Sequence, residues 1–376
     1  MNSGNKLYIW QQDEWPSWRY NHAQLMPLLG QVHQSLGRLT GRMRDQGISS
    51  QSRVNLEALT LDAVKTSEIE GERLDYDTVR SSVANHLGMD IGGILPTDRN
   101  VEGVVDMVLD ATADHAKPLT EARLHRWHEG LFPFARSDMS SISTGSWRTD
   151  QDGPMQVISG PIQRRRVHFE APEAPRLGRE IAVFLSWFDK PDDTDPILKA
   201  ALAHLWFVTI HPYDDGNGRI ARAISDLALA RADLSSQRFY SVSAQIQKER
   251  KTYYELLEKT QKGNLEVTEW LTWFLSCLLR ALKYADETLT QVLSKASFWQ
   301  RWITTPFNER QIKVLNLMLH DFQGKLTNKK WTALCKCSSD TALRDINELL
   351  TRGVLAKSES GGRSTSYALV IYPQQA

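Results

Sequence analysis

Cysteine is scarce in this chain of 376 residues, which contains only Cys277, Cys335 and Cys337. A sparse and odd set argues against a disulfide framework and is typical of a reducing compartment. Cys335 and Cys337 are close in sequence, but no other Cys or His lies near them. A zinc site is therefore not expected.

An excess of charge and long apolar runs are also lacking. Lys and Arg together number 45, as do Asp and Glu, so no net charge directs the chain to nucleic acid or to a membrane. No apolar run reaches the roughly 18 residues of a membrane helix, and the polar start does not resemble a signal peptide. We therefore expect a cytoplasmic protein that binds no membrane.

Helical periodicity dominates what the sequence does contain. The chain is too long for one typical core, so two or three domains are expected. Apolar residues recur at helical spacing along most of it, which predicts a mostly α fold. We expect an N-terminal helical region at residues 1–95, a helical core at 96–292 and a separate C-terminal domain at 300–376.

Residues 155–170 break the helical pattern. Residues 155–159 and 165–169 have β-like composition, and Gly160-Pro161 between them favours a turn. We predict a β-hairpin in an otherwise helical region. Helices are expected to resume at 197–210, 218–232, about 245–261 and 266–291.

The last 70 or so residues predict three helices followed by two strands, a pattern that resembles a winged helix–turn–helix. The third helix would carry Asp340, Asp345 and Glu348, with few basic residues beside them. A recognition helix normally needs a basic surface. We therefore expect this domain to contact protein, and DNA binding is not expected.

The stretch from His211 to Arg222 is the most informative part of the chain. Pro212 disfavours helix at His211 and ends the preceding helical run. A turn at Gly216-Asn217-Gly218 then leads into a second helix, whose first N–H groups form an anion site. Arg219 and Arg222 lie three apart on its first turn, where cations oppose the helix dipole unless an anion binds between them.

Each of these residues also has an ordinary structural explanation. His211 alone is as consistent with a hydrogen-bonded core histidine as with a general base whose pKa lies near its usual value. Asp215 could cap the second helix, or bind Mg²⁺ with one carboxylate as that ion commonly requires. The two arginines beside a Gly-rich turn make the phosphate-binding interpretation the more specific one.

Taken together, residues 211–222 resemble the Fic family signature, His-x-Phe-x-Asp/Glu-Gly-Asn-Gly-Arg-x-x-Arg, with Tyr213 in place of Phe. The resemblance implies a protein adenylyltransferase that moves AMP from Mg-ATP to Ser, Thr or Tyr hydroxyls of proteins. It implies His211 as the base and Asp215 as the Mg²⁺ ligand. The residues that it places on the nucleotide phosphates are Gly216, Asn217, Gly218, Arg219 and Arg222.

A second motif bears on regulation. The residues from Thr66 to Glu70 and Gly71 match the family's inhibitory motif, Ser/Thr-x-x-x-Glu-Gly/Asn, which precedes the catalytic motif as in class II Fic proteins. In that class the glutamate, here Glu70, pairs with Arg222 and blocks productive placement of the γ-phosphate. A helix is predicted at 52–70 with Gly71 as its left-handed cap, so an exposed glutamate beside a capping glycine is the alternative.

Two weaker resemblances complete the site. The hairpin at 155–170 resembles the Fic flap, whose edge would pair with the target and whose residues Val167 and His168 would approach the nucleotide. Tyr253 and Tyr254 resemble the family's tyrosine pair beside the adenine, although an aromatic pair on a helix is more often core.

Alternatives to simple AMP transfer stay open at this point. One is a bifunctional or dedicated enzyme that removes AMP, with Glu70 orienting water. Another is a winged-helix DNA-binding regulator whose Fic core senses nucleotide. For the leading interpretation we expect ATP and Mg²⁺, a protein target, self-modification and a homodimer.

Overall fold

The computed structural model describes residues 8–90, 98–133, 142–151, 153–161, 164–319, 322, 324–358 and 365–370. The chain is mostly helical, as the sequence predicts, and divides into two compact units, Met1–Ala285 and Asp286–Ala376. None of the helices in the described ranges combines the length and hydropathy needed to cross a bilayer.

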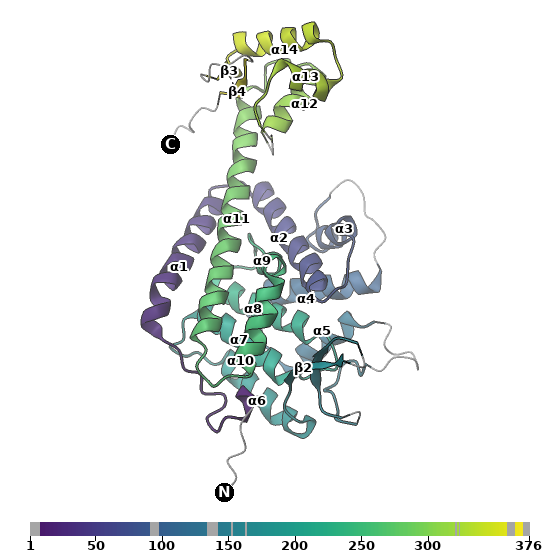
Figure 1. Ribbon diagram of the computed structural model, residues 1–376, viewed down its shortest axis with the longest axis vertical. Coiled ribbons are helices and arrows are strands. Elements are labelled where there is room, and N and C mark those ends of the chain that lie inside the picture. Colours follow the sequence, from purple (N-terminus) through teal and green to yellow (C-terminus); the bar gives the residue numbers. More distant parts are fainter. Residues whose placement is uncertain are drawn as a thin grey trace. The chain divides into compact units, whose positions relative to one another are not determined.

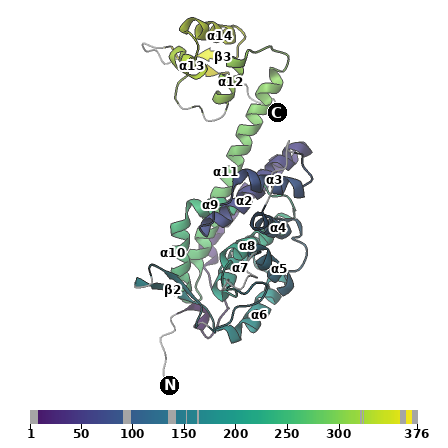
Figure 2. The same cartoon turned by 90° about the vertical axis from the view of Figure 1, so that its right-hand side faces the viewer.

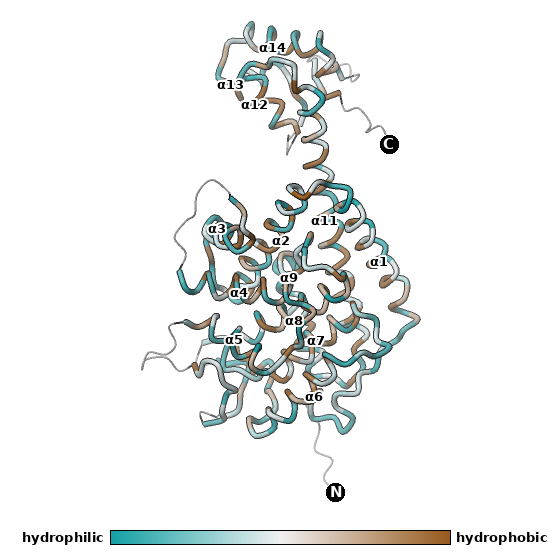
Figure 3. Tube along the Cα trace, turned by 180° about the vertical axis from the view of Figure 1, so that it is seen from behind, coloured by the Kyte–Doolittle hydropathy of each residue, from teal (hydrophilic) through white to brown (hydrophobic). Residues whose placement is uncertain are grey.

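The first unit is built around α7 (Pro196–Ile210) and α8 (Asn217–Asp233), which pack against each other more extensively than any other pair of elements in the described residues. Helix α7 is apolar on all sides and almost wholly buried, as a central helix must be. The surrounding helices instead carry both hydrophilic and hydrophobic residues, as the mixed colours of the labelled ones show (Figure 3). They are α1 (His22–Arg44), α2 (Ile48–Ile69), α3 (Tyr76–His86), α4 (Arg99–Ala113), α5 (Glu121–Leu131), α6 (Leu177–Asp189), α9 (Val242–Lys248) and α10 (Arg250–Gln261) (Figure 1).

Two helix predictions need correction. The single helix expected at about 245–261 is two, because the chain bends at Glu249, whose carboxylate accepts hydrogen bonds from Arg280 at 2.7 and 2.6 Å. Helix α11 (Thr268–Arg301) continues ten residues beyond the predicted end at 291. The contact at Glu249 joins residues 31 positions apart, which local periodicity does not encode.

The predicted hairpin is present as antiparallel strands β1 (Gln156–Ser159) and β2 (Arg166–Glu170), with a bulge between Val157 and Ile158. Strand β2 lies beside α10 in both views (Figures 1 and 2). The N-terminal segment packs against the same hairpin, because Trp10 Nε1 donates to the carbonyl oxygen of Glu170 at 2.8 Å.

The second unit contains the end of α11, then α12 (Glu309–Met318), α13 (Asn328–Cys335), α14 (Ser339–Thr351), β3 (Leu355–Lys357) and β4 (Tyr367–Leu369). These are the predicted elements, packed around the fully buried ring of Trp331. Their interpretation as a winged helix stays a prediction. Asp345 is not a surface acid, because it is buried and accepts hydrogen bonds from Arg310 at 2.7 and 3.0 Å.

Candidate active site

The loop between α7 and α8 carries most of the predicted site. Helix α7 ends at Ile210, as Pro212 predicts, and His211 adopts a left-handed φ of 51°. Gly216 has φ 79°, and a Cβ on it would lie 2.9 Å from the Phe132 ring. Glycine is therefore required at this position by both conformation and space.

The side chain of Asn217 holds this loop closed. Its Oδ1 accepts from the backbone N–H of Tyr213 at 3.0 Å, and its Nδ2 donates to the Tyr213 carbonyl at 2.8 Å. The ring of Tyr213 is buried and stacks on His128, with its hydroxyl 3.1 Å from Nδ1 of His125. The tyrosine that replaces the usual phenylalanine is thus accommodated with a partner for its hydroxyl.

His211 is held in the form that a general base requires. Its Nδ1 lies 3.2 Å from the Val208 carbonyl oxygen, which can only accept, so Nδ1 carries the proton and Nε2 the lone pair. Burial, helped by the charge of Arg148, lowers the pKa of the imidazole to about 4. The expectation of a pKa near the usual value is wrong, and the ring is neutral at physiological pH.

Arg148 fixes the backbone around His211 and is not part of any motif in the sequence. Its Nε donates to the His211 carbonyl at 2.8 Å, and its backbone N–H donates to the Pro212 carbonyl at 3.0 Å. Its Nη2 donates a third hydrogen bond to the Pro172 carbonyl at 2.5 Å. Arg148 lies 63 positions before His211, and no spacing rule links such residues.

The end of α2 brings the second motif to the loop. Gly71 has φ 91°, which confirms the left-handed cap, and the N–H of Glu72 bonds to the Ser67 carbonyl at 3.1 Å, closing a Schellman motif. Because the cap fixes the backbone here, the side chain of Glu70 is presented to α8.

Glu70 and Thr66 together bind Arg222. Glu70 Oε1 lies 2.7 Å from Arg222 Nη2, and Arg222 also donates to Thr66 Oγ1 at 2.7 Å and to the Thr66 carbonyl at 3.0 Å. Burial opposes ionisation of Glu70, but the charge of Arg222 and its hydrogen bond outweigh burial and lower the pKa of the carboxyl. The pair is ionised at neutral pH.

The Glu70 carboxylate also lies on the N-terminus of α8. A Cβ built on Gly218 would be 2.2 Å from Glu70 Oε1, so the carboxylate lies almost against this backbone. A helix N-terminus attracts anions through its unpaired N–H groups. Glu70 therefore lies where an anionic ligand of this loop would bind.

Arg219 is held by a second glutamate that the motif did not identify. Its Nη1 lies 2.8 Å from Oε2 of Glu72, and its guanidinium lies over the ring of Phe132. The one available signal was a second acid directly after the capping Gly71. Both motif arginines are thus paired with acids from the end of α2.

Two buried nitrogens of these arginines have no hydrogen-bond partner among the described residues. They are Arg222 Nη1 and Arg219 Nε. An unpaired buried donor is costly, and a charged one more so. These donors leave hydrogen-bonding capacity on the two arginines for an acceptor such as a phosphate oxygen.

Helix α10 supports Glu70 from the other side. The Tyr254 hydroxyl lies 3.1 Å from Glu70 Oε2, and Arg250 Nε donates to the Ile69 carbonyl at 2.7 Å. Tyr253, by contrast, is 1% exposed, and its hydroxyl meets His204 Nε2 at 2.9 Å. Tyr253 is a core residue here, and its buried ring has no face open to an adenine.

The remaining predicted residues lie on the hairpin and at the loop surface. His168 Nδ1 meets Glu258 Oε2 on α10 at 2.6 Å, while Val167 is 37% exposed. Hydrogen bonds from Lys262, His168 and Arg166 outweigh burial and lower the pKa of Glu258 to about 2.

Asp215, the predicted Mg²⁺ ligand, lies on the loop before α8. It is exposed, and its Oδ1 accepts the Gly216 N–H at 2.6 Å.

Comparisons with known proteins match two segments of this chain. Residues 118–229 match the Fic/DOC family, and residues 8–89 match a domain of unknown function, DUF4172. The chain is similar to "Protein adenylyltransferase Fic" of Nematostella vectensis, with 37% identity over 97 residues, covering 25% of this chain and 21% of that protein. It is also similar to "Protein adenylyltransferase fic-1" of Caenorhabditis briggsae, with 36% identity over 81 residues. This match covers 20% of this chain and 16% of that protein. The matched segments thus span about a fifth of these relatives.

Solved structures show the same fold. A Fic family protein from Desulfovibrio desulfuricans superposes with a TM-score of 0.52 and 20% identity, covering 93% of this chain and 98% of that one. A Fic-domain signaling protein from Bacteroides thetaiotaomicron superposes with a TM-score of 0.50 and 19% identity. This match covers 69% of this chain and 96% of that one. At these identities the likeness concerns the fold alone.

Proposed function

We propose that this chain, which contains a Fic/DOC-family domain, is a protein adenylyltransferase that is inhibited by its own Glu70. It would transfer AMP from ATP to a Ser, Thr or Tyr hydroxyl of a protein target. The observation that carries the proposal is that His211, with Nδ1 on the Val208 carbonyl, lies on the loop that leads to an anion site where Arg219 pairs with Glu72 and Arg222 with Glu70. The experiment that tests it is labelling of protein with ATP carrying a labelled α-phosphate.

The chemistry assigned to His211 is proton removal. As the target oxygen bonds to the α-phosphorus, the bond from that phosphorus to the bridging oxygen breaks and pyrophosphate leaves. The hydroxyl proton passes to Nε2 of His211, the nitrogen with the lone pair. A neutral imidazole is required for this role, and the lowered pKa supplies it.

The phosphates would be held by the start of α8. Backbone N–H groups of Gly216, Asn217 and Gly218 provide donors, and Arg219 and Arg222 provide charge. Glu70 competes for the same place, since its carboxylate lies against Gly218 and pairs with Arg222. Inhibition follows because a γ-phosphate would meet a carboxylate and an arginine that is already paired.

Asp215 fits the needs of a magnesium ion that accompanies ATP. It is an exposed carboxylate at the edge of the anion site. Mg²⁺ usually takes one or two protein carboxylates and completes its shell with phosphate and water. The ion would neutralise phosphate charge, and Asp215 would hold it.

Asp215→Ala should weaken the effect of Mg²⁺ on nucleotide binding and lower activity, because the ion loses its carboxylate. The measurement is ATP affinity against Mg²⁺ concentration by calorimetry. Asp214→Ala is the matched control, since Asp214 accepts the N–H of Ser143 at 3.0 Å and lies next in sequence. Equal Mg²⁺ dependence in Asp215→Ala and the wild type would remove the assignment.

The protonation state of His211 can be measured directly. Because its pKa is lowered to about 4, the ring should stay neutral as pH falls from 8 to about 5.5, and gain a proton only below that range. A histidine peptide in the same tube should titrate near about 6.5. The measurement is the titration of the His211 Cε1–H resonance by NMR, with the resonance assigned by its loss in His211→Asn. A midpoint between 6 and 7 would contradict the lowered pKa of His211.

The target would dock on the hairpin at residues 155–170. Its strand edges offer backbone groups to an extended segment, and Ile158 is an exposed apolar side chain there. The substrate would be a protein, and the chain would also modify itself. Two copies of the chain would form a homodimer. Val167 and His168 would then lie near the nucleotide.

A further inference from the structure

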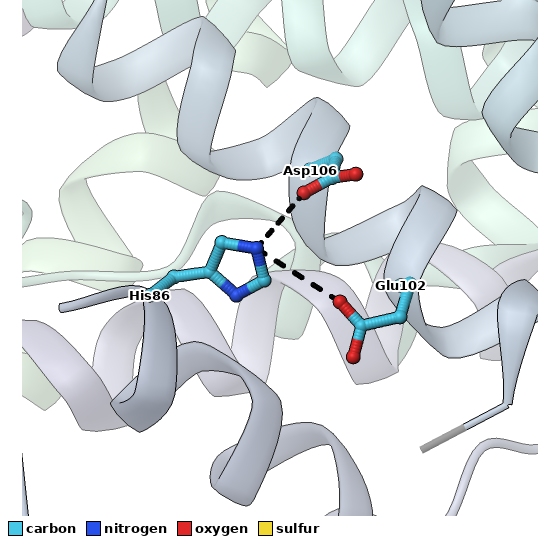
Figure 4. A group of neighbouring side chains, drawn as sticks. All are labelled: His86, Glu102 and Asp106. Carbon is cyan, nitrogen blue, oxygen red and sulfur yellow. Dashed lines mark ion pairs between the residues drawn. The ribbon is translucent and has the colours of Figure 1, made fainter. Parts of the chain in front are cut away.

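We propose that His86, Glu102 and Asp106 form a binding site for a divalent transition-metal ion, with Zn²⁺ as the best match. The site is separate from the proposed active site and does not depend on the proposed function. Figure 4 shows the three side chains converging, the histidine from the end of α3 and the two carboxylates from α4. Within the described residues, this is the one group of three or more His, Cys, Asp or Glu that is compact enough to share an ion.

The spacing of the ligand atoms suits a small cation. His86 Nε2 lies 3.1 Å from Asp106 Oδ1 and 3.9 Å from Glu102 Oε2, and all three ligand atoms lie within 4.8 Å of one another. Zinc–ligand bonds of roughly 2.0–2.2 Å separate tetrahedral ligands by about 3.4 Å. Small side-chain movements would therefore bring the three atoms into one coordination shell.

The sequence places these ligands on facing helix surfaces. Glu102 and Asp106 are four apart, so they lie on one face of α4, one turn from each other. His86 stands in the last turn of α3, which packs against α4. An ion held by all three would cross-link the two helices on either side of their connection.

The hydrogen bond of His86 to the backbone suits a metal ligand. His86 Nδ1 lies 2.9 Å from the Ser82 carbonyl oxygen, which can only accept, so Nδ1 carries a proton. Nε2 is the nitrogen that faces both carboxylates. In the neutral ring, that nitrogen presents its lone pair to the space between them.

One buried residue orients two of the ligands. Ser82 is 2% exposed; its carbonyl accepts from His86, and its hydroxyl donates to Glu102 Oε1 at 3.0 Å. Histidine ligands of metals usually donate their other ring N–H to such an acceptor, and ligand carboxylates are usually hydrogen-bonded in turn. A chance surface ion pair does not require this arrangement.

The ligand set selects the ion. Imidazole suits Zn²⁺, Cu²⁺, Fe²⁺ and Ni²⁺ and is uncommon around Mg²⁺ and Ca²⁺, which favour oxygen alone. Asp106 has a side chain 66% exposed, so the site opens to solvent. Water would complete the shell and leave one position open to exchange.

The test is zinc binding to the full chain after chelator treatment, by competition with a chromophoric chelator at pH 7.5 in a Cys335→Ser/Cys337→Ser background. We expect one tight site that His86→Gln weakens at least tenfold and Asp106→Asn weakens similarly. Ser82→Ala keeps all three ligands and should weaken binding about tenfold. Cobalt in place of zinc should give visible absorption that the same variants lose.

The matched control is His33→Gln. His33 Nε2 pairs with a single carboxylate, Asp195 Oδ2, at 2.8 Å, so it tests what a histidine–carboxylate pair binds without a third ligand. This variant should bind zinc as the background protein does. Unchanged zinc affinity in a folded Asp106→Asn, or affinity weaker than millimolar in the background protein, would show that the group is an ordinary surface ion pair and overturn the proposal.

Discussion

His211→Asn is expected to lower the rate of AMP transfer by about 10²–10⁴-fold, the usual contribution of a general base, while ATP still binds. The side chain enters only the chemical step, so the loss should appear in kcat. Asparagine is preferable to alanine here, because His211 has φ 51° and asparagine tolerates the left-handed region. The measurement is kcat and ATP affinity for both proteins, in the Glu70→Gly background so that activity is measurable.

The control for this prediction is His33→Asn, an exposed histidine on α1 whose carboxylate partner, Asp195, caps α7 at its other end. It should transfer AMP at the background rate. His211→Ala should show the same loss as His211→Asn, since both lack the base. If either His211 variant labels protein as fast as its background, proton removal by His211 is not part of the reaction.

Glu70→Gly is expected to raise AMP transfer at least tenfold. Removing the carboxylate frees Arg222 for the γ-phosphate and opens the N-terminus of α8, where the Glu70 carboxylate lies against Gly218. It also removes like-charge repulsion between that carboxylate and the triphosphate. The measurement is the initial rate of label incorporation at saturating Mg-ATP.

Two variants separate release of inhibition from a general disturbance of α2. Arg222→Ala should not activate, because it removes the partner of Glu70 and a phosphate ligand together. Glu68→Gly is the matched control, since Glu68 lies two residues earlier and pairs with Lys65 at 2.5 Å rather than with the loop. If Glu68→Gly activates as strongly as Glu70→Gly, the effect is a loosening of the helix, and Glu70 has no specific role.

The parts of the site that the sequence predicts well are those encoded locally. Pro212 ends α7, and Gly71 caps α2, because proline and glycine act on the backbone within one or two residues. The Glu70–Arg222 contact was expected only from the resemblance of both motifs to one family. The structure brings these side chains to 2.7 Å across 152 positions.

The features that sequence analysis missed are long-range contacts of ordinary residues. Arg148 binds the backbone of His211 from 63 positions away, and nothing in its local sequence distinguishes it. Glu72 binds Arg219 from 147 positions away, and its one local signal is its place directly after Gly71. The lowered pKa of His211 depends on burial, which becomes known only when the helices are packed. The same packing buries Tyr253 and leaves Tyr254 beside Glu70.

The most direct test is incubation of three proteins with Mg²⁺ and ATP labelled at the α-phosphate, followed by detection of label on the chain itself and on lysate proteins. The wild type should label weakly, Glu70→Gly strongly, and Glu70→Gly/His211→Asn no more than background. Labelling by Glu70→Gly that is no greater than that of the wild type, or labelling that persists in the double variant, would contradict a His211-dependent adenylyltransferase held inactive by Glu70.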